Sequence, residues 1–410
     1  MKKDYYDDDL GEIDYAEQYR RQLDRYNKLS QNDDYDDDDD DYEDYYDEPV
    51  KKQPQKKSAH KGSRYNAPDK EQLKKNFGSS GQDKKRKKKK MHPAKKIIII
   101  ILIILLLLFI LLQVFLWKYI GYIKKADTGT RNYTQASMKS DDVLNILLIG
   151  SDTRDPDENG RTDSIILLSV DKSKKKITMT SFMRDCYVTF PGIDNDGDGA
   201  YDQGKINAAN VYGGRELLLD TIEYNFDIAV DKYFYVDFMS FAKIVDSVGG
   251  IELDITDEEA AGMEDPMGEQ NNIFGNPAGT DYLDKGGKGL HVNGNQALAY
   301  ARLRYVGNAD FQRTERQRTV ITKIIDKAKS LGPFKIGDFM ETALSSLTTN
   351  YTSSELYWLS YKLPFIAGYE IVSQRIPEDD GYTYGDHDGQ STLDVDFDNA
   401  KSQLRTSIYS

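Results

Sequence analysis

The chain has 410 residues, enough for one large domain or two ordinary ones, and a formal net charge of −14. Its single cysteine, Cys186, excludes an intrachain disulfide, and the four histidines do not form a Cys/His metal-binding pattern.

Residues 1–96 are predicted to form a disordered cytoplasmic tail. They contain an acidic run, DDYDDDDDDYEDYYDE (Asp33–Glu48), and a basic run, KKRKKKK (Lys84–Lys90), with almost no aliphatic clusters. Such a composition cannot bury enough apolar surface to offset the loss of chain entropy. For the Tyr- and Asp-rich run, two interpretations stay open: it binds a cytoplasmic protein partner, or it excludes other molecules by charge.

The next stretch, IIIIILIILLLLFILLQVFLW (Ile97–Trp117), carries no charge and is about as long as a bilayer core is thick. We predict one transmembrane helix over residues 97–120. A signal peptide is the weaker interpretation, because this run is too long and too deep in the chain. The preceding basic run places the N-terminus in the cytoplasm and everything after the helix outside the cell. It also favours attraction to anionic lipid over nucleic-acid binding.

Residues 121–141 are polar and are predicted to be a stalk, and residues 142–400 an extracellular domain. Short apolar runs predict strands at 143–150, 164–170, 176–182, 186–190, 232–238, 251–255, 370–376 and 392–397. Apolar periodicity and capping residues predict helices at 214–226, 238–248, 293–302 and 312–330. The Gly-, Asn- and Asp-rich residues 257–288 are predicted to be a long loop. Strands alternating with helices predict an α/β fold, with a mixed central sheet flanked by helices.

Two carboxylates are candidates for a metal site at the ends of neighbouring strands. Asp152 directly follows the first strand, and Asp163 opens the next one. Ligands gather at strand ends of open α/β sheets. Paired carboxylates there can hold Mg²⁺, with waters and substrate phosphates completing the shell. The alternative is turn and cap chemistry, for which Asp is also common.

Arginines form a second candidate site, because the guanidinium fork suits phosphate. Arg184 ends the strand 176–182 beside Asp185. Arg302 and Arg304 have the i, i+2 spacing of an extended segment, and Arg313 and Arg316 share a helix face at i, i+3. The alternative is a solvated basic face. Arg318 lies off the shared face and is predicted to be structural.

The loop DNDGDGAYDQGK (Asp194–Lys205) begins like a calcium loop, with acids at alternate positions. Lys205 occupies the twelfth position, where a calcium loop has Glu. A solvated turn is therefore the favoured interpretation of the Asp194–Asp198 segment, and calcium binding is the alternative.

Several blocks together resemble the LytR–CpsA–Psr family of Gram-positive cell-envelope proteins. In chain order they are NILLIGSDTR, GRTDSIILLSV, SFMRD, GKINAANVYGG, VDFMSFAKIVDSVGGIELDI, GLHVNGNQALAYARLR and DFQRTERQRTVI. The resemblance covers about residues 141–330. The DNDGDG segment and the acidic tail are particular to this chain. The resemblance implies the α/β sandwich of that family.

The resemblance also implies a phosphotransferase. Its substrate is a glycopolymer (a teichoic acid, a capsular polysaccharide or another wall glycan) on a polyprenyl-pyrophosphate lipid. The polymer moves with one phosphate to peptidoglycan, onto the 6-hydroxyl of N-acetylmuramic acid. Implied with it are Mg²⁺, or Mn²⁺ in its place, and an apolar groove for the lipid. Arg184, Arg302, Arg304, Arg313 and Arg316 would clamp the pyrophosphate. Asp152 and Asp163 would bind the metal, or one would act as the base.

Two other functions are weighed against this one. A membrane-bound transcriptional regulator or attenuator would need a nucleic-acid-binding element inside the cell. The tail has no helix-turn-helix pattern, and its acidic run would repel DNA. A non-catalytic lipid-binding scaffold is the second, and would bind polyprenyl phosphate without turnover.

Overall fold

The computed structural model describes residues 93–126, 129–153, 159–332 and 335–410. The predicted disordered tail, up to residue 92, lies outside the described residues. The first described helix is α2 (Pro93–Ile120). Its part from Ile100 to Ile120 has a mean hydropathy of 3.2 and is long and apolar enough to cross a membrane.

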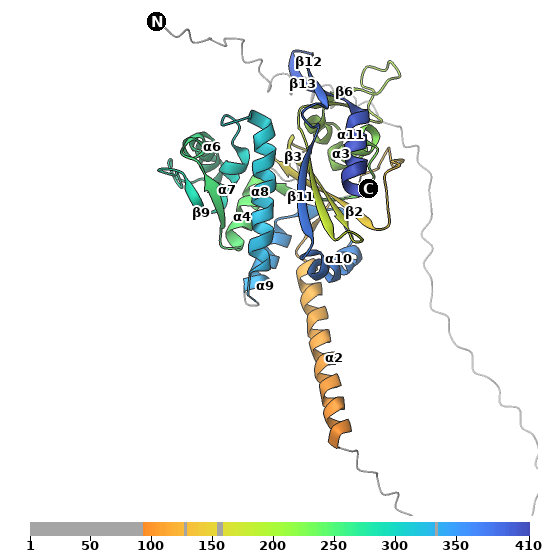
Figure 1. Cartoon of the computed structure of the whole chain (residues 1–410), viewed down its shortest axis with the longest axis vertical. Coiled ribbons are helices and arrows are strands. Elements are labelled where there is room, and N and C mark those ends of the chain that lie inside the picture. Colours follow the sequence, from red (N-terminus) through yellow and green to blue (C-terminus); the bar gives the residue numbers. More distant parts are fainter. Residues whose placement is uncertain (1–92, 127–128, 154–158, 333–334) are drawn as a thin grey trace, which may run out of the picture. The chain divides into compact units, whose positions relative to one another are not determined.

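A mixed seven-stranded sheet forms the centre of the domain (Figure 1). In their order across the sheet, the strands are β1 (Lys124–Lys125), β10 (Thr348–Thr349), β7 (Lys232–Asp237), β2 (Val143–Ser151), β3 (Thr162–Asp171), β4 (Lys176–Phe182) and β11 (Glu370–Ile376). Strands β2, β3 and β4 pair antiparallel as a meander, whereas β7 runs parallel to β2 and β11 runs parallel to β4. The predicted α/β fold with a mixed central sheet is confirmed.

The two faces of the sheet have different neighbours, because successive strand residues point to opposite sides. Leu147 and Ile149 of β2 belong to the main core, which α3 (Ala209–Phe226) and α11 (Phe397–Leu404) close. Helices α4 (Phe238–Ser247), α7 (Gly294–Arg302) and α8 (Ala309–Lys329) lie on the other side of the sheet (Figure 1). These helices belong to a second core, which includes Val245, Ala299 and Val320.

Two smaller sheets complete the strands. The four-stranded sheet consists, in order, of β12 (Tyr382–His387), β13 (Gln390–Val395), β5 (Cys186–Thr189) and β6 (Gln203–Lys205). The pair β8 (Ile251–Ile255) and β9 (Gly287–Val292) packs into the second core. Helix α4 ends at Gly249 and Gly250, whose φ angles are 84° and 76°. Their amides donate to Asp246 O and Val245 O, which is how a left-handed glycine terminates a helix.

The prediction of a long loop at 257–288 is wrong for its first half. This segment contains α5 (Asp257–Gly262) and α6 (Glu264–Phe274). Thr256 and Glu259 form a capping box that starts α5, and Met263 and Met267 are fully buried in the second core. Burial of this apolar stripe outweighs the low helix propensity of the Gly- and Asn-rich sequence around it.

The predicted stalk, residues 121–141, does not hang free. Strand β1 pairs with β10, and Met138 bridges to Ile228. Arg131 forms ion pairs with the buried carboxylates of Asp220 and Glu223. The described part of this segment therefore belongs to the folded domain, because its polar residues find partners there that composition alone does not reveal.

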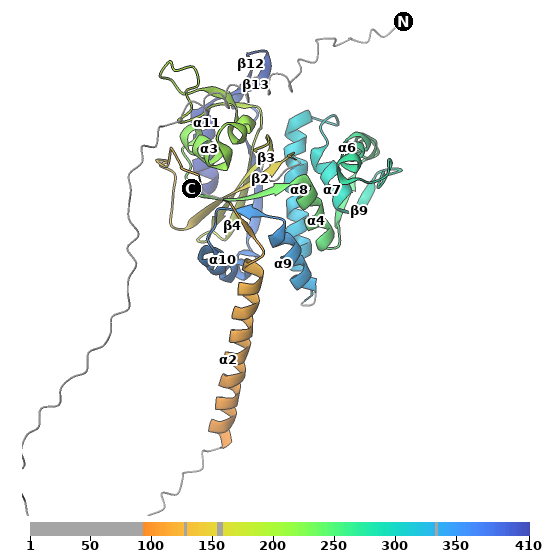
Figure 2. The same cartoon turned by 180° about the vertical axis from the view of Figure 1, so that it is seen from behind.

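Two helices near the C-terminal end of α2 were not predicted. They are α9 (Lys335–Ser345) and α10 (Ser353–Ile366), and both contact α2 (Figure 2). A capping box between Thr352 and Glu355 starts α10. The short helical turns Ile206–Ala208 and Arg405–Tyr409 complete the described structure.

Candidate active site

A cavity of about 540 Å³ lies between the central sheet and the helices α4, α7, α8 and α9. On the sheet side its walls are Leu148, Leu168, Phe234 and Val236, which occupy the strand positions that alternate with main-core residues. The helices contribute further apolar side chains, which are Phe241, Leu298, Ile321, Ile324, Ile325 and Phe339. The same cavity is lined by the charged residues Arg184, Arg302, Arg304 and Arg313, and by Asp163, Asp237, Asp265 and Glu269. An apolar chamber is thus joined to a cationic end.

Asp310, in the first turn of α8, lies at the centre of the cationic end. Its carboxylate is 2.7 Å from Arg313 Nη2, 3.2 Å from Arg304 Nε and 3.6 Å from Arg184 Nε. Arg184, which follows β4, also donates from Nη1 to Asp163 Oδ1 at 2.7 Å. We call Arg184, Arg304, Arg313 and Asp310 the arginine cluster.

The three guanidiniums of the arginine cluster share Asp310, and Arg184 also pairs with Asp163 and lies 3.5 Å from Asp185, yet some of their N–H groups stay without a hydrogen-bond acceptor in the described part of the chain. Burial, followed by the neighbouring charge of Arg184, lowers the pKa of the Arg313 guanidinium. The buried Nε–H groups of Arg184 and Arg313 have no aligned acceptor among the described residues. A site with surplus cationic donors suits an anion with several oxygens, such as a phosphate.

Arg302 also lines the cavity but is held by a separate set of contacts. It is the last residue of α7, and Arg304 follows two residues later, beyond the C-cap Leu303, so the expected extended segment is wrong for Arg302. The Arg302 guanidinium donates to Glu269 Oε2 at 2.7 Å and to Pro266 O at 3.2 Å, and it lies 4.7 Å from the centroid of the Phe238 ring. These contacts fix the fork at the cavity wall.

Asp152 and Asp163 lie at adjacent strand ends, as predicted. Ser151, which ends β2, pairs with Thr162, which begins the antiparallel strand β3, and Asp163 is the extra residue between this pair and the pair Gly150–Ser164. Asp152 and Asp163 therefore belong to the same end of the two strands. Asp152 is accessible to solvent, but neighbouring protein removes part of its hydration. This desolvation, followed by the negative charge of Asp163, raises the pKa of Asp152. Two carboxylates that repel each other, one of them on the cavity wall, fit a divalent cation with oxygen ligands.

Arg316 does not reach the cavity, and its predicted role in phosphate binding is withdrawn. Its side chain is 2% exposed, pairs with Glu259 at 3.0 Å and donates to Leu303 O and Val306 O. These bonds hold the turn between α7 and α8. Arg318, predicted to be structural, is buried and donates to Ser181 Oγ at 2.7 Å. Burial is the main cause that lowers the pKa of Arg318 to about 10.

One face of α8 runs along the cavity from its charged end to its apolar end. It presents Arg313, Gln317, Ile321 and Ile324, at the i, i+4, i+8, i+11 spacing of one helix stripe. Sequence reasoning missed Gln317 and the central position of Asp310. The signal was available for Gln317, because the change from Arg to Ile along one stripe indicates an amphiphilic groove.

Residues of the Asp194–Asp198 loop do not line the cavity. Asp194, Asp196 and Asp202 bring one carboxylate oxygen each within 4.8 Å of the others, and Asp194 accepts from the amides of Gly197 and Gly199. These are the bonds of a polar turn. Calcium binding at this loop stays an untested alternative.

The chain matches known proteins over most of the described domain. The model of the LytR_cpsA_psr family matches residues 118–407. A polyisoprenyl-teichoic acid–peptidoglycan teichoic acid transferase TagU of Enterococcus faecalis is 33% identical over 223 residues, which are 52% of this chain and 65% of that protein. Biofilm regulatory protein A of Streptococcus mutans is 32% identical over 57% of this chain and 55% of its own length. The chain thus spans less than two thirds of either relative.

Solved structures share the fold. The crystal structure of Bacillus subtilis TagT superposes with a TM-score of 0.52 at 23% identity, over 70% of this chain and all of that one. Protein gbs0355 of Streptococcus agalactiae gives a TM-score of 0.51 at 25% identity, over 65% of this chain and 88% of its own. The arrangement of sheet and helices in this chain is therefore the same as in these crystal structures.

Proposed function

Because the chain belongs to the LytR_cpsA_psr family, we propose that it is a phosphotransferase that moves a glycopolymer from a polyprenyl-pyrophosphate carrier to peptidoglycan. A relative that is one third identical carries the name of a teichoic acid transferase. The polymer in this case is a teichoic acid or another wall glycan, such as a capsular polysaccharide.

One observation carries the proposal: the cationic end and the apolar chamber belong to one cavity. A polyprenyl-pyrophosphate substrate has the same two parts, a doubly charged head and a long hydrocarbon chain. The arginine cluster and Arg302 suit the head, and the walls of Phe234, Phe241 and Ile324 suit the chain. Apolar burial of a polyprenyl chain contributes about 0.8 kcal/mol per CH₂, so even part of the chain would supply much binding energy.

In the proposed reaction the peptidoglycan hydroxyl attacks the phosphorus next to the glycopolymer. The new P–O bond joins polymer phosphate to peptidoglycan, the pyrophosphate P–O bond breaks, and polyprenyl phosphate leaves. Asp152 or Asp163 accepts the hydroxyl proton. Arg184, Arg302, Arg304 and Arg313 hold the phosphate oxygens as charge shifts onto the leaving group. Phosphoryl transfer depends mainly on such positioning and charge stabilisation.

We further propose that Asp152 and Asp163 hold Mg²⁺, or Mn²⁺ in its place. The support is their adjacency and the raised pKa of Asp152, which partly reflects the charge of Asp163. Mg²⁺ commonly uses one or two carboxylates together with substrate phosphates. When bound, the cation would neutralise negative charge on the pyrophosphate.

The membrane location is part of the same proposal. Helix α2 spans the membrane once, the N-terminus is cytoplasmic and the domain faces outward, where peptidoglycan lies. The position of α9 supports access of a membrane-bound lipid substrate to the cavity. Phe339 of α9 lines the cavity, and a Cβ on Gly337 of the same helix would lie 2.8 Å from Tyr119 Oη of α2. The cavity wall is therefore close to the last turn of the anchor.

The test is transfer by the full chain reconstituted in lipid nanodiscs. Lipid-linked glycopolymer, a peptidoglycan oligomer and Mg²⁺ are supplied, and the polymer–peptidoglycan product is followed by mass spectrometry. We expect product, together with release of polyprenyl phosphate. Tight binding of the lipid-linked polymer without product over a long incubation would instead favour the non-catalytic scaffold.

A further inference from the structure

Helix α10 carries an unusual surface for a protein domain in water. Beyond α2, four exposed large hydrophobic side chains among the described residues are not tyrosines, and three of them are Trp358, Leu363 and Phe365 of α10. Their exposed fractions are 62%, 48% and 75%, and only Leu356 of this helix is buried. Clustered apolar exposure of this kind indicates a contact surface.

The place of α10 beside α2 identifies what covers this surface. The ring of Tyr357 stacks on Trp117 of α2, with centroids 5.2 Å apart. The hydroxyls of Tyr357 and Tyr361 both bond to the side chain of Gln113, also on α2. Gln113 lies seven residues before the end of α2, or about 10 Å along its axis at 1.5 Å per residue. Helix α10 thus lies against the last apolar turns of the anchor, not above them.

The length of α2 then sets the depth of α10. The uncharged run from Ile97 to Trp117 is about 30 Å long as a helix, the thickness of a bilayer core. If this run spans the membrane, Trp117 lies at the outer interface, where tryptophan is enriched. The helix that stacks on Trp117 must then lie at the interface as well.

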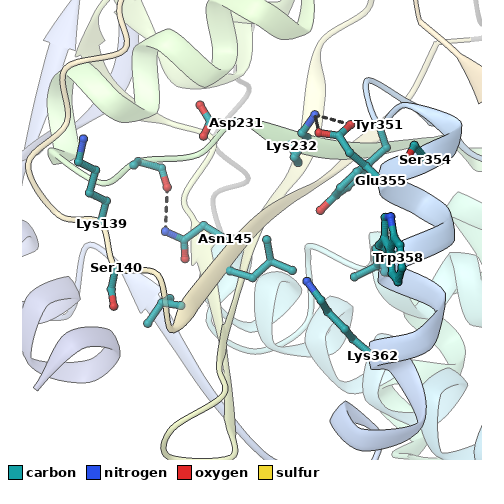
Figure 3. Close-up of a pocket in the computed structure, with 14 residues that line it drawn as sticks. Lys139, Ser140, Asn145, Asp231, Lys232, Tyr351, Ser354, Glu355, Trp358 and Lys362 are labelled. Atoms are coloured by element: carbon teal, nitrogen blue, oxygen red, sulfur yellow. Dashed lines mark hydrogen bonds and ion pairs between the residues drawn. The ribbon is translucent and has the colours of Figure 1, made fainter.

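The charges near α10 agree with this position. Lys118, Lys124 and Lys125 follow the apolar run and are exposed, and Lys362 is exposed on α10 between Trp358 and Phe365. Trp358, Lys362 and Phe365 share one helix stripe at i, i+4, i+7. A pocket of about 440 Å³ lies beside this stripe, and Lys139, Lys232 and Lys362 line it together with Trp358 (Figure 3). Asp231 and Glu355 also line it, and Glu355 pairs with Lys232 at 2.7 Å, so Lys139 and Lys362 are the lysines for which no carboxylate partner is recorded among the described residues.

We propose that the exposed stripe of α10 lies in the headgroup layer of the membrane, and that the lysine-lined pocket beside it binds an anionic phospholipid headgroup. The apolar side chains enter the upper acyl region, as in an interfacial helix, and Lys139 and Lys362 pair with lipid phosphate. Helix α10 is thus a second membrane contact that orients the domain. This inference rests on the proposed spanning of the membrane by α2.

The two tryptophans of the chain provide the test. The full chain is reconstituted in nanodiscs of phosphatidylcholine and phosphatidylglycerol whose acyl chains carry bromine at a shallow or a deep position. Trp117→Phe leaves Trp358 as the only tryptophan, and Trp358→Phe leaves Trp117. We expect shallow bromine to quench Trp358 more than deep bromine does, and iodide in the buffer to quench it weakly.

The reference for an aqueous site is Tyr384→Trp in the background of both Phe substitutions, because Tyr384 on β12 is 72% exposed. If Trp358 behaves as this reference does while Trp117 is quenched by bromine, the anchor stands and the proposed contact of α10 is wrong. If Trp117 also escapes bromine, the spanning of the membrane by α2 is wrong, and the proposal fails with its premise.

A charge arm tests the headgroup pocket. Adding phosphatidylglycerol to phosphatidylcholine nanodiscs should increase the bromine quenching of Trp358, and Lys139→Glu with Lys362→Glu should abolish this increase. The control is the double variant Lys243→Glu with Lys288→Glu, which changes the charge by the same amount. Both lysines are exposed elsewhere on the domain. Equal responses of the two double variants would show that anionic headgroups do not bind at this pocket.

Discussion

At the scale of single residues, the position of Asp310 explains how several arginines can face one cavity before substrate binds. Each of Arg184, Arg304 and Arg313 lies within 3.6 Å of its carboxylate. One carboxylate shared by three guanidiniums lowers their mutual repulsion without saturating their donors. The three guanidiniums therefore stay close together and still have N–H donors available for an anionic ligand.

The first prediction concerns these arginines. Arg184→Ala and Arg302→Ala should each lower the transfer rate about a hundred- to a thousandfold, or about 2.7–4 kcal/mol, by analogy with the loss of one oxyanion donor. The unfolding temperature of Arg302→Ala should change little, because the carboxylate of its partner Glu269 is exposed. Arg302→Lys should also be poor, because lysine lacks the bidentate fork.

Arg405→Ala is the matched control for this prediction, since Arg405 is exposed near the C-terminus and does not line the cavity. Arg318→Ala would be a poor control, because it would leave Ser181 without its buried donor. Equal rates for Arg302→Ala and Arg405→Ala would mean that the cationic end takes no part in transfer.

The second prediction concerns the pH dependence of stability at Asp152. Its pKa is raised in the folded protein, so the folded state keeps the proton over a pH range in which the unfolded chain has lost it. The contribution of Asp152 to the free energy of unfolding therefore falls as pH rises from the ordinary carboxyl pKa through the raised value, and stays low above it.

Asp152→Asn should remove this penalty. Without Mg²⁺ the variant should unfold at a higher temperature than the wild type at neutral pH, and the difference should vanish in acid, where both side chains are uncharged. Mg²⁺ should then stabilise the wild type more than the variant. Calorimetry at both pH values measures this, and an unchanged difference between neutral and acidic pH would argue against the proposed environment of Asp152.

At the scale of elements, α8 joins the two halves of the cavity. Its first turns carry Asp310 and Arg313, and its later turns carry Ile321 and Ile324 on the same side. A single rigid helix therefore sets the spacing between the phosphate site and the lipid chamber.

The third prediction uses this helix. Ile321→Trp should fill part of the chamber and lower transfer from a long-chain polyprenyl carrier more than transfer from a short-chain analogue, because only the long chain needs the occluded volume. Lys323→Trp, at an exposed position of the same helix, should leave both rates near those of the wild type. Rates with the two carriers give the ratio, and an equal loss for both carriers would point to misfolding of α8 instead.

The fourth prediction concerns the segment between α2 and β2. The Asp220 and Glu223 side chains are 0% and 2% exposed and pair with Arg131. Removing one partner of a buried ion pair typically costs about 3–5 kcal/mol, because it leaves buried charge uncompensated. Arg131→Ala should lower the free energy of unfolding by about that amount in urea titration. Lys243→Ala, at an exposed position, should stay within about 0.5 kcal/mol of the wild type.

A free stalk would make Arg131→Ala as mild as Lys243→Ala. In that case the contacts of residues 129–138 with the domain would contribute nothing to its stability, and the spacing between the anchor and the domain would be variable.

At the scale of the whole molecule, the chain combines one apolar helix with a domain whose cavity wall approaches that helix. The proposed reaction requires this domain on the outer side of the membrane, because the peptidoglycan hydroxyl exists only there.

The fifth prediction is therefore the topology. A protease-cleavable tag in residues 1–90 should be protected in intact protoplasts, and a tag inserted beside the exposed Gly197 should be cleaved. Permeabilised protoplasts, in which both tags should be cleaved, are the control. The opposite pattern would remove the basis of the proposed transfer.

The sequence by itself determined those features that depend on neighbouring residues. The apolar run is long enough to predict a membrane-spanning helix, and short apolar stretches predict the strands. Asn293 and Gly249 mark helix ends through local capping. The mixed α/β fold and the placement of Asp152 and Asp163 at neighbouring strand ends follow from the same local signals. The family resemblance added the expected chemistry.

Only the tertiary structure decided which helix side chains face the core and which face the cavity. Helix periodicity places Arg313 and Arg316 near one another, but Glu259, far away in the sequence, draws Arg316 into the core, while Arg313 faces the cavity. For the same reason Arg131 binds the domain and Trp358 stays exposed beside α2. Burial depends on which distant segments pack together, and a spacing pattern contains no information about them.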